Sequence, residues 1–174
     1  MYLYNWRVER FLFAVFIAII ITIFSVAITQ AQTVPTISCS TNGSIFNTAY
    51  SRDDGPPLQS GFDPEWDVAI RTAPFTGSPL PNDLTFIDAS VVSTAPGAWT
   101  ASPFNNANWI SYNSTGSHPD QSSNYDSFYR YQFNLDPAVD PSAFKLRMDF
   151  YSDNSVWDVW VNGQPQGIRS SFGS

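Results

Sequence analysis

Apolar residues are distributed along this chain in two different ways. Phe11–Ile28 is a continuous apolar run interrupted only by Thr22 and Ser25, whereas the chain after residue 31 is broken into short segments. Several of these segments alternate apolar and polar residues, which is the period of a β-strand. No apolar helical period longer than two turns occurs after residue 31. The pattern predicts a hydrophobic N-terminal helix followed by an all-β region.

The strand signal recurs at short intervals after the leader. The predicted strands are Ile45–Thr48, Trp66–Thr72, Leu84–Val92, Trp109–Tyr112, Phe128–Leu135, Phe144–Tyr151 and Val156–Val161. Most of them have one apolar and one polar face, as expected for an antiparallel sheet that is packed on one side. Stretches rich in proline, glycine, serine and asparagine separate them. Short strands with frequent turns favour an antiparallel β-sandwich of the jelly-roll type.

The leader combines three features of an export signal. Arg7 and Arg10 precede the apolar run, and Thr29 and Ala31 are small residues at the positions that cleavage after Ala31 requires. The run is longer than the ~7–15 residues of a usual signal core and approaches the ~20 that span a bilayer. An uncleaved membrane anchor is therefore the alternative to a signal peptide. Both predict a secreted or cell-surface protein that touches the membrane only through this segment.

The leader and the segment after it suggest three regions. Residues 1–31 are the signal peptide or anchor, residues 32–41 a linker, and residues 42–174 the β-sandwich domain. Asn162-Gly163 is a strong hairpin signal of type I′, but Gln164–Ser174 is mostly polar and makes a weak returning strand. Because an unpaired edge strand is a liability that natural proteins avoid, we expect a domain truncated at its C-terminus; a weak returning strand is the alternative.

Charge and cysteine content exclude several classes of function. The chain has 15 acidic and 8 basic residues; without Arg7, Glu9 and Arg10 of the leader, residues 32–174 carry 14 acidic and 6 basic side chains, a net charge of −8. Nucleic acid is therefore not an expected partner, since phosphate binding relies on clustered Lys and Arg. One Cys and one His exclude a disulfide framework and a Cys/His zinc site. Cys39 is either a buried thiol or an intermolecular partner.

Catalytic and metal-binding patterns are sparse. His118 lies in a polar loop without a fixed nucleophile, and we predict no catalytic residue and no enzyme. Glu65 and Asp67 fall on one face of a predicted strand, which we interpret as a solvated surface; a glycoside hydrolase would need two carboxyls across a cleft. Carboxylate and amide oxygens suit Ca²⁺. Candidate ligands of a structural calcium are Asp63, Asp153 and Asn154.

Aromatic residues make up 16% of the chain and are its most suggestive feature. Most of them are expected in the core, because aromatic side chains dominate sandwich cores. Strand periodicity puts Trp157 on the core face and Trp160 on the opposite face. An exposed indole beside polar side chains suits stacking on a sugar or contact with another protein. The candidate ligand-binding residues are Trp160, Trp109, Tyr151 and Asp158.

An ordered series of short motifs supports a family resemblance. The series is Gly61-Phe-Asp63-Pro-Glu-Trp66, Pro96-Gly-Ala-Trp99, Asn108-Trp109-Ile110, Tyr129-Arg-Tyr-Gln-Phe-Asn-Leu135, Asp153-Asn154 and Val159-Trp-Val-Asn-Gly163. Over residues 42–170 it resembles the galactose-binding-like jelly-roll modules of bacterial secreted and cell-surface proteins and carbohydrate-binding modules. The resemblance implies an eight- or nine-stranded β-sandwich, often with a structural calcium, and a further apolar strand after the hairpin. It identifies no binding residue, because ligand contacts in that superfamily lie on variable loops.

These features favour a noncatalytic extracellular binding or adhesion module whose partner is a glycan or another surface protein. The alternatives are a structural spacer without a ligand and the accessory domain of an extracellular glycoside hydrolase. Solvent exposure of Trp160, Trp109 and Tyr151 distinguishes the first two, because a glycan platform requires exposed rings and a spacer buries them.

Overall fold

The computed structural model describes residues 33–72, 75, 79–117 and 125–170. The chain divides into two units, residues 1–31 and 32–174, and all described residues belong to the second. The predicted N-terminal helix and His118 lie outside the described residues. Within the described ranges, no helix has the length and apolar character that crossing a membrane requires.

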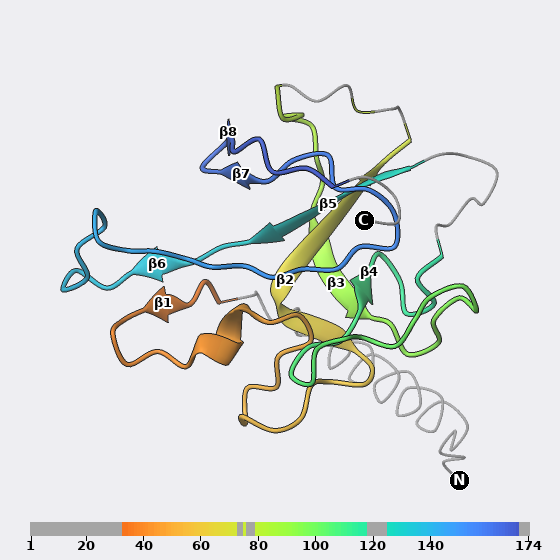
Figure 1. Cartoon of the computed structure of the whole chain (residues 1–174), viewed down its shortest axis with the longest axis horizontal. Helices are drawn as coiled ribbons and strands as arrows, with labels where there is room; N and C mark the ends of the chain where they lie inside the picture. Colours follow the sequence, from red (N-terminus) through yellow and green to blue (C-terminus); the bar gives the residue numbers. More distant parts are fainter. Residues whose placement is uncertain (1–32, 73–74, 76–78, 118–124, 171–174) are drawn as a thin grey trace, which may run out of the picture. The chain divides into compact units, whose positions relative to one another are not determined.

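The described residues form short strands and one 3₁₀ turn (Figure 1). The elements are β1 (Thr36–Ile37), η1 (Gly43–Phe46), β2 (Phe62–Arg71), β3 (Ile87–Val91), β4 (Ile110–Ser111), β5 (Asp126–Tyr131), β6 (Asn134–Leu135), β7 (Trp160–Val161) and β8 (Gln164–Pro165). No α-helix occurs in this part of the chain, so the all-β prediction is confirmed.

The main sheet has four antiparallel strands in the order β4-β3-β2-β5. β2, β3 and β4 lie largely within three of the predicted strands. The predicted strand Phe128–Leu135 contains most of β5 and also β6, which belongs to another sheet. β2 is one of the two inner strands and pairs with β5 from Trp66 opposite Tyr131 to Arg71 opposite Asp126. β1 pairs with β6 in parallel and β7 pairs with β8, each in a two-stranded sheet. β1 lies within residues 32–41, so part of the predicted linker belongs to the folded domain.

Core residues cover both faces of β2. Val68 and Ala69 are neighbours that point to opposite faces, and both are 0% exposed. Val68 packs with Ala89 and Ile110 in one cluster, and Ala69 packs in another with two phenylalanines, Phe75 and Phe128. Burying a large apolar side chain contributes about 1.5–3 kcal/mol. The prediction of one solvated face is therefore wrong for this strand, because segments distant in sequence cover its second face.

The prediction of a strand at Ile45–Thr48 is also wrong, because Ile45 and Phe46 belong to the 3₁₀ turn η1. The side chain of Asn42 accepts a hydrogen bond from the backbone N–H of Ser44 at 3.0 Å and caps the turn. Asparagine is a strong capping residue, so a local side-chain bond replaces strand pairing here.

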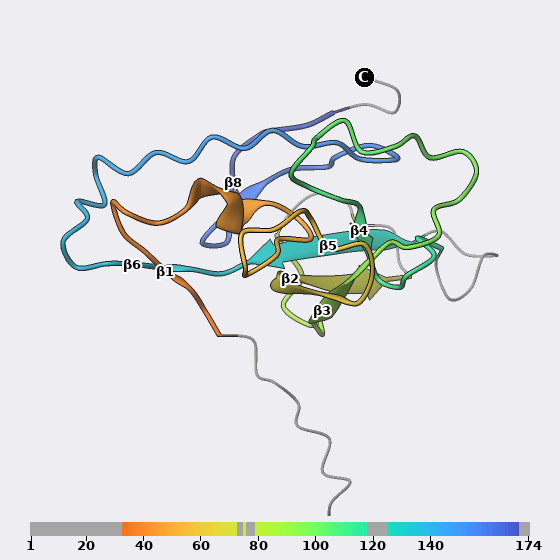
Figure 2. The same ribbon diagram turned by 90° about the horizontal axis from the view of Figure 1, so that it is seen from below.

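The predicted strands of the C-terminal part are mostly absent as strands. Phe144–Tyr151 is described but contains no strand, and Figure 2 shows it as an extended trace apart from the four-stranded sheet. Of Val156–Val161, only β7 and an isolated bridge from Val156 to Ser170 form. A strand needs a neighbour to satisfy its backbone groups, and alternation in the sequence does not supply one.

The hairpin after β7 forms as predicted. Asn162 has φ of 50° and Gly163 has φ of 77°, the two positive values that a type I′ turn requires. The returning strand is β8, which pairs Gln164 with Val161 and Pro165 with Trp160. The polar segment after the turn thus supplies a two-residue partner strand.

Candidate functional site

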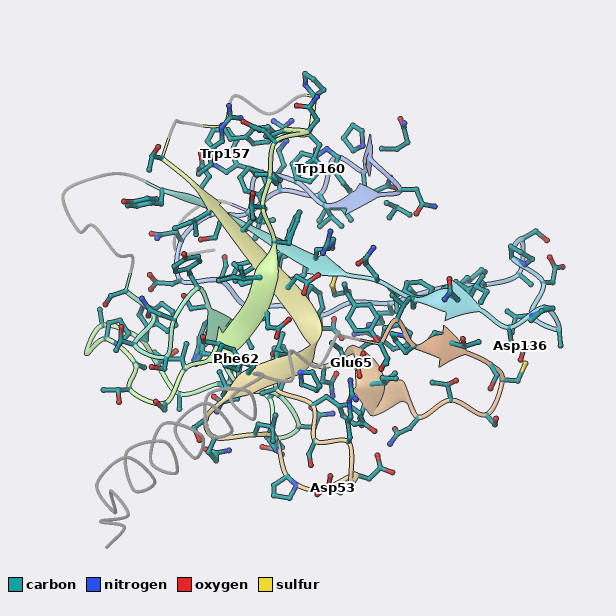
Figure 3. The ribbon with its side chains drawn as sticks, turned by 180° about the vertical axis from the view of Figure 1, so that it is seen from behind. Asp53, Phe62, Glu65, Asp136, Trp157 and Trp160 are labelled. Carbon is teal, nitrogen blue, oxygen red and sulfur yellow. The ribbon has the colours of Figure 1, made fainter. Side chains whose placement is uncertain are left out.

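A pocket of about 240 Å³ lies beside β2 of the main sheet. Glu65 and Asp67 of β2, Asp88 of β3, Arg130 of β5 and Gln132 just after β5 supply its polar lining. The segment Thr33–Pro35 completes it. Figure 3 shows Glu65 on the ribbon of β2. Three neighbouring strands thus bring acidic, basic and amide groups to one cavity.

An irregularity in β2 positions the acidic pair. The register between β2 and β3 shifts between Phe62 and Asp67, and Asp63 holds the displaced backbone. Its Oδ1 accepts the N–H groups of Glu65 and Trp66, both at 2.8 Å, and its Oδ2 accepts the N–H of Ala49 at 2.5 Å. Burial raises the pKa of Asp63, and these three bonds oppose that rise. Asp63 therefore acts as a backbone anchor.

Asp67 forms a charged pair with Arg130 inside the pocket. Its Oδ2 accepts from Nε of Arg130 at 2.9 Å and from Nη2 at 2.5 Å. The Asp67 side chain is 8% exposed and that of Arg130 is 40% exposed. The guanidinium also lies over the ring of Phe86, 4.0 Å from its centroid, which is a cation–π arrangement. The guanidinium is thus fixed on two sides.

Glu65 is held less completely than Asp67. Its Oε1 pairs with Nη2 of Arg52 at 3.1 Å, and its side chain is 5% exposed. Its Oε2 is buried and has no hydrogen-bond partner among the described residues. Burial raises the pKa of Glu65, the charge of Arg52 opposes this rise, and the charge of Asp63 adds to it. The pocket therefore contains a carboxyl with unused hydrogen-bonding capacity.

For Glu65 and Asp67, the predicted shared face is correct and the predicted exposure to solvent is wrong. Glu65 and Asp67 do share a face, since both line the pocket. Their interpretation as a solvated face is wrong, because the two residues are 6% and 5% exposed. The sequence signal that could have indicated burial was the pair Arg130 and Gln132, which are two residues apart in the predicted strand Phe128–Leu135, as Glu65 and Asp67 are two residues apart. That signal becomes informative only once β5 is known to lie beside β2.

The structure reverses the predicted faces of two tryptophans. Trp160 packs against the cluster around Ala69, with its ring 5.6 Å from that of Phe75, and its buried Nε1 lacks a partner among the described residues. Trp157, expected in the core, is 50% exposed. Figure 3 shows both indoles. Residues 157–159, between the isolated bridge at Val156 and β7, form no strand, so the alternation assumed over Val156–Val161 does not persist.

The other three candidate ligand residues lie in different settings. Trp109 is half-buried, 5.0 Å from the ring of Trp99. Tyr151 is 63% exposed. The Asp158 side chain is 3% exposed, and its Oδ1 accepts the N–H groups of Val159 and Ile168. No hydrogen bond, ion pair or ring contact in the described part of the chain joins these residues to one another or to Trp160.

The three candidate calcium ligands lie in different settings, one buried and two exposed, and the calcium site stays a prediction. Asp63 already accepts three backbone N–H groups, while Asp153 and Asn154 are exposed. Ca²⁺ takes six to eight oxygen ligands. Among the residues described, no three His, Cys, Asp or Glu side chains are grouped so as to hold a metal ion.

Cys39 is exposed and free, which excludes its interpretation as a buried thiol. No protein-family model, curated protein or solved structure matches the chain.

Proposed function

We propose that residues 32–174 form a noncatalytic binding module outside the cytoplasm, as part of a secreted or cell-surface protein. Its ligand is a glycan unit held in the pocket lined by β3, β2, β5 and the segment Thr33–Pro35. The observation that carries this proposal is the convergence of Glu65, Asp67, Arg130 and Gln132 on one cavity of about 240 Å³.

The chemistry of the lining suits a ligand with many hydroxyl groups. Carboxylates accept and guanidinium and amide groups donate hydrogen bonds, so the pocket offers both partners that a sugar hydroxyl needs. The unpartnered Oε2 of Glu65 adds an acceptor, because a buried polar atom without a partner is unfavourable until a donor reaches it.

Binding accounts for the two carboxyls better than glycoside hydrolysis does. Hydrolysis needs two carboxyls that act on one glycosidic bond, one protonating it and one attacking or activating water. Asp67 is instead bound through Oδ2 to both Nε and Nη2 of Arg130, and Glu65 through Oε1 to Arg52. Each carboxyl is thus neutralised by its own arginine, which is an arrangement that orients groups for recognition.

The proposal includes a jelly-roll β-sandwich of the galactose-binding-like type. The antiparallel order β4-β3-β2-β5 and the aromatic packing on both faces of β2 support it. The N-terminal apolar run supports export, with the segment as signal peptide or anchor.

A glycan array probed with the full chain in mild detergent, with and without Ca²⁺, tests the proposal. We expect retention of one class of glycan, and Gln132→Ala should weaken it by about tenfold, the effect of one hydrogen bond to a ligand. Gln59→Ala is the matched control, because Gln59 is exposed and does not line the pocket.

Two outcomes contradict this assignment. Retention of no glycan under either condition would leave the spacer alternative. Loss of binding in Trp157→Ala with unchanged binding in Gln132→Ala would move the ligand from the pocket to the exposed indole of Trp157.

A further inference from the structure

The segment Phe144–Tyr151 is extended, strongly alternating and unpaired. Leu146, Met148 and Phe150 are 49%, 42% and 40% exposed. No backbone–backbone hydrogen bond joins residues 145–155 to the rest of the described chain. Figure 2 shows the segment as a separate strand-like trace. It thus has the side-chain pattern of a β-strand and the open backbone of a sheet edge.

Open edges of this kind bind further strands. An exposed row of N–H and C=O groups is a template for pairing with another chain, and peptide recognition by strand addition uses it. A bound strand satisfies the backbone groups and covers the apolar side chains together. The charges on the other face then decide which strand fits.

The charge pattern of the segment is complementary to itself in one register. In an antiparallel pair centred on Met148, Arg147 of each copy lies opposite Asp149 of the other. In the same register Leu146 lies opposite Phe150, and Met148 faces Met148. Opposite charges and apolar pairs directly across two strands are both stabilising. In the monomer Arg147 and Asp149 already lie on one side, with Nη2 and Oδ1 3.2 Å apart.

Neighbouring registers lack this match. Centring the pair on Arg147 or on Asp149 places two like charges opposite each other, which is destabilising. A shift by a single residue places apolar side chains opposite charged ones, because side chains alternate between faces. Parallel pairing in register also sets Arg147 beside Arg147. Centring on Arg147 does set Lys145 opposite Asp149 and keeps apolar side chains together, but it also sets Arg147 opposite Arg147. Of these registers, the one centred on Met148 pairs opposite charges and apolar side chains without a like-charge pair.

We propose that two copies of the chain associate through Phe144–Tyr151, which pair as antiparallel strands about a two-fold axis at Met148. The interface is isologous, as in most symmetric dimers. It brings two copies of the binding pocket into one particle, so that the dimer presents two sites to a repetitive surface.

Disulfide trapping tests the register directly. The full chain is held in mild detergent with Cys39→Ser as background, and Met148→Cys is compared with Leu146→Cys, a similarly exposed residue on the same face. Opposed residues in an antiparallel pair have Cα atoms about 4.5–5.5 Å apart, which suits a disulfide. Two Leu146 positions would lie about 14 Å apart, given a rise of about 3.4 Å per residue and the separation of the two strands. We expect Met148→Cys to form the disulfide dimer at least about tenfold faster.

Charge variants provide an independent measurement. In the Met148→Cys background, Arg147→Asp should slow dimer formation by about tenfold because it sets Asp opposite Asp149 twice. Adding Asp149→Arg should restore the rate, since the opposite charges are exchanged but kept. All substitutions are at exposed positions, and near-ultraviolet circular dichroism checks that each variant stays folded.

Three results overturn the proposal. Equal trapping at positions 146 and 148 would show collision without a register. Faster trapping in Arg147→Cys than in Met148→Cys would show a different register. A folded Met148→Cys chain that stays monomeric under oxidation would exclude a second copy and leave a strand of another protein as the occupant.

Discussion

β2 and Phe144–Tyr151 have the same alternating pattern but opposite fates. β2 pairs with β3 on one edge and with β5 on the other, and its centre is fully buried on both faces. Phe144–Tyr151 pairs with no strand in the described chain and has large apolar side chains in solvent. An alternating apolar and polar pattern therefore indicates that a segment can form a strand. Whether the segment pairs depends on which other segments the fold places beside it.

The ion pairs of the two regions differ in the same sense. Asp67 and Arg130 join two neighbouring strands, and the carboxylate is buried. Arg147 and Asp149 lie two residues apart in one segment, with side chains 87% and 61% exposed. An exposed pair contributes little to stability, whereas a buried carboxylate depends on its partner.

The largest expected difference between the regions concerns their apolar residues. Val68→Asp should lower the free energy of unfolding by about 4 kcal/mol or more, because it buries a charge without a partner. Leu146→Asp should change it by less than about 0.5 kcal/mol, since this position is exposed. Urea unfolding of the full chain at low protein concentration measures both. Similar losses in the two variants would refute the distinction between the regions.

The ion pairs give the next largest difference. Arg130→Met should lower the free energy of unfolding by about 2 kcal/mol, less than for a fully buried pair because the Arg130 side chain is 40% exposed. Arg147→Met is the matched control and should have no measurable effect. Adding Asp67→Asn to Arg130→Met should recover part of the loss by removing the unpaired carboxylate. A double variant as unstable as the sum of its single variants would show that the two side chains do not interact.

The smallest expected effect is a difference in the sign of the pH dependence, between Glu65 of β2 and Asp140, which lies just before Phe144–Tyr151 in the chain. Burial raises the pKa of Glu65 above its usual 4.5, so its contribution to stability is full below that value and is lost as pH rises through the folded pKa. Hydrogen bonds from Ser142 lower the pKa of Asp140 below 3.8, so its contribution is present above that value and is lost as pH falls through the folded pKa.

Unfolding free energies measured against pH separate these two carboxyls. Relative to the unsubstituted chain, Glu65→Gln should gain stability as pH rises above 4.5. Relative to the same reference, Asp140→Asn should gain stability as pH falls below 3.8. A pH-independent difference for Glu65→Gln would contradict the assignment of its raised pKa to burial.

Local sequence signals predicted the parts of the fold that depend on neighbouring residues. The period-two pattern of Trp66–Thr72 and of Phe128–Leu135 located β2 and β5, and Asn162-Gly163 located the turn between β7 and β8. A turn of this kind needs only two residues that tolerate positive φ. Such features are encoded within a few residues and can be read without a partner.

The candidate site could be predicted only in outline. The spacing of Glu65 and Asp67 showed that they share a face, but their burial depends on Arg130 and on the segment Thr33–Pro35, which the chain brings from distant positions. The same holds for Trp160, which is covered because Phe75 lies against it. Whether a polar face is solvated is a property of the neighbouring strand and of the loops above it.

The sequence by itself determined an apolar N-terminal run, an acidic all-β region, the approximate positions of the main-sheet strands and the turn at Asn162-Gly163. The tertiary structure alone decided that β2 is buried on both faces, that its acidic side chains meet an arginine in a pocket, and that Phe144–Tyr151 stays unpaired. The physical reason is that strand periodicity is local, whereas backbone pairing and burial require a second segment whose position no local pattern contains.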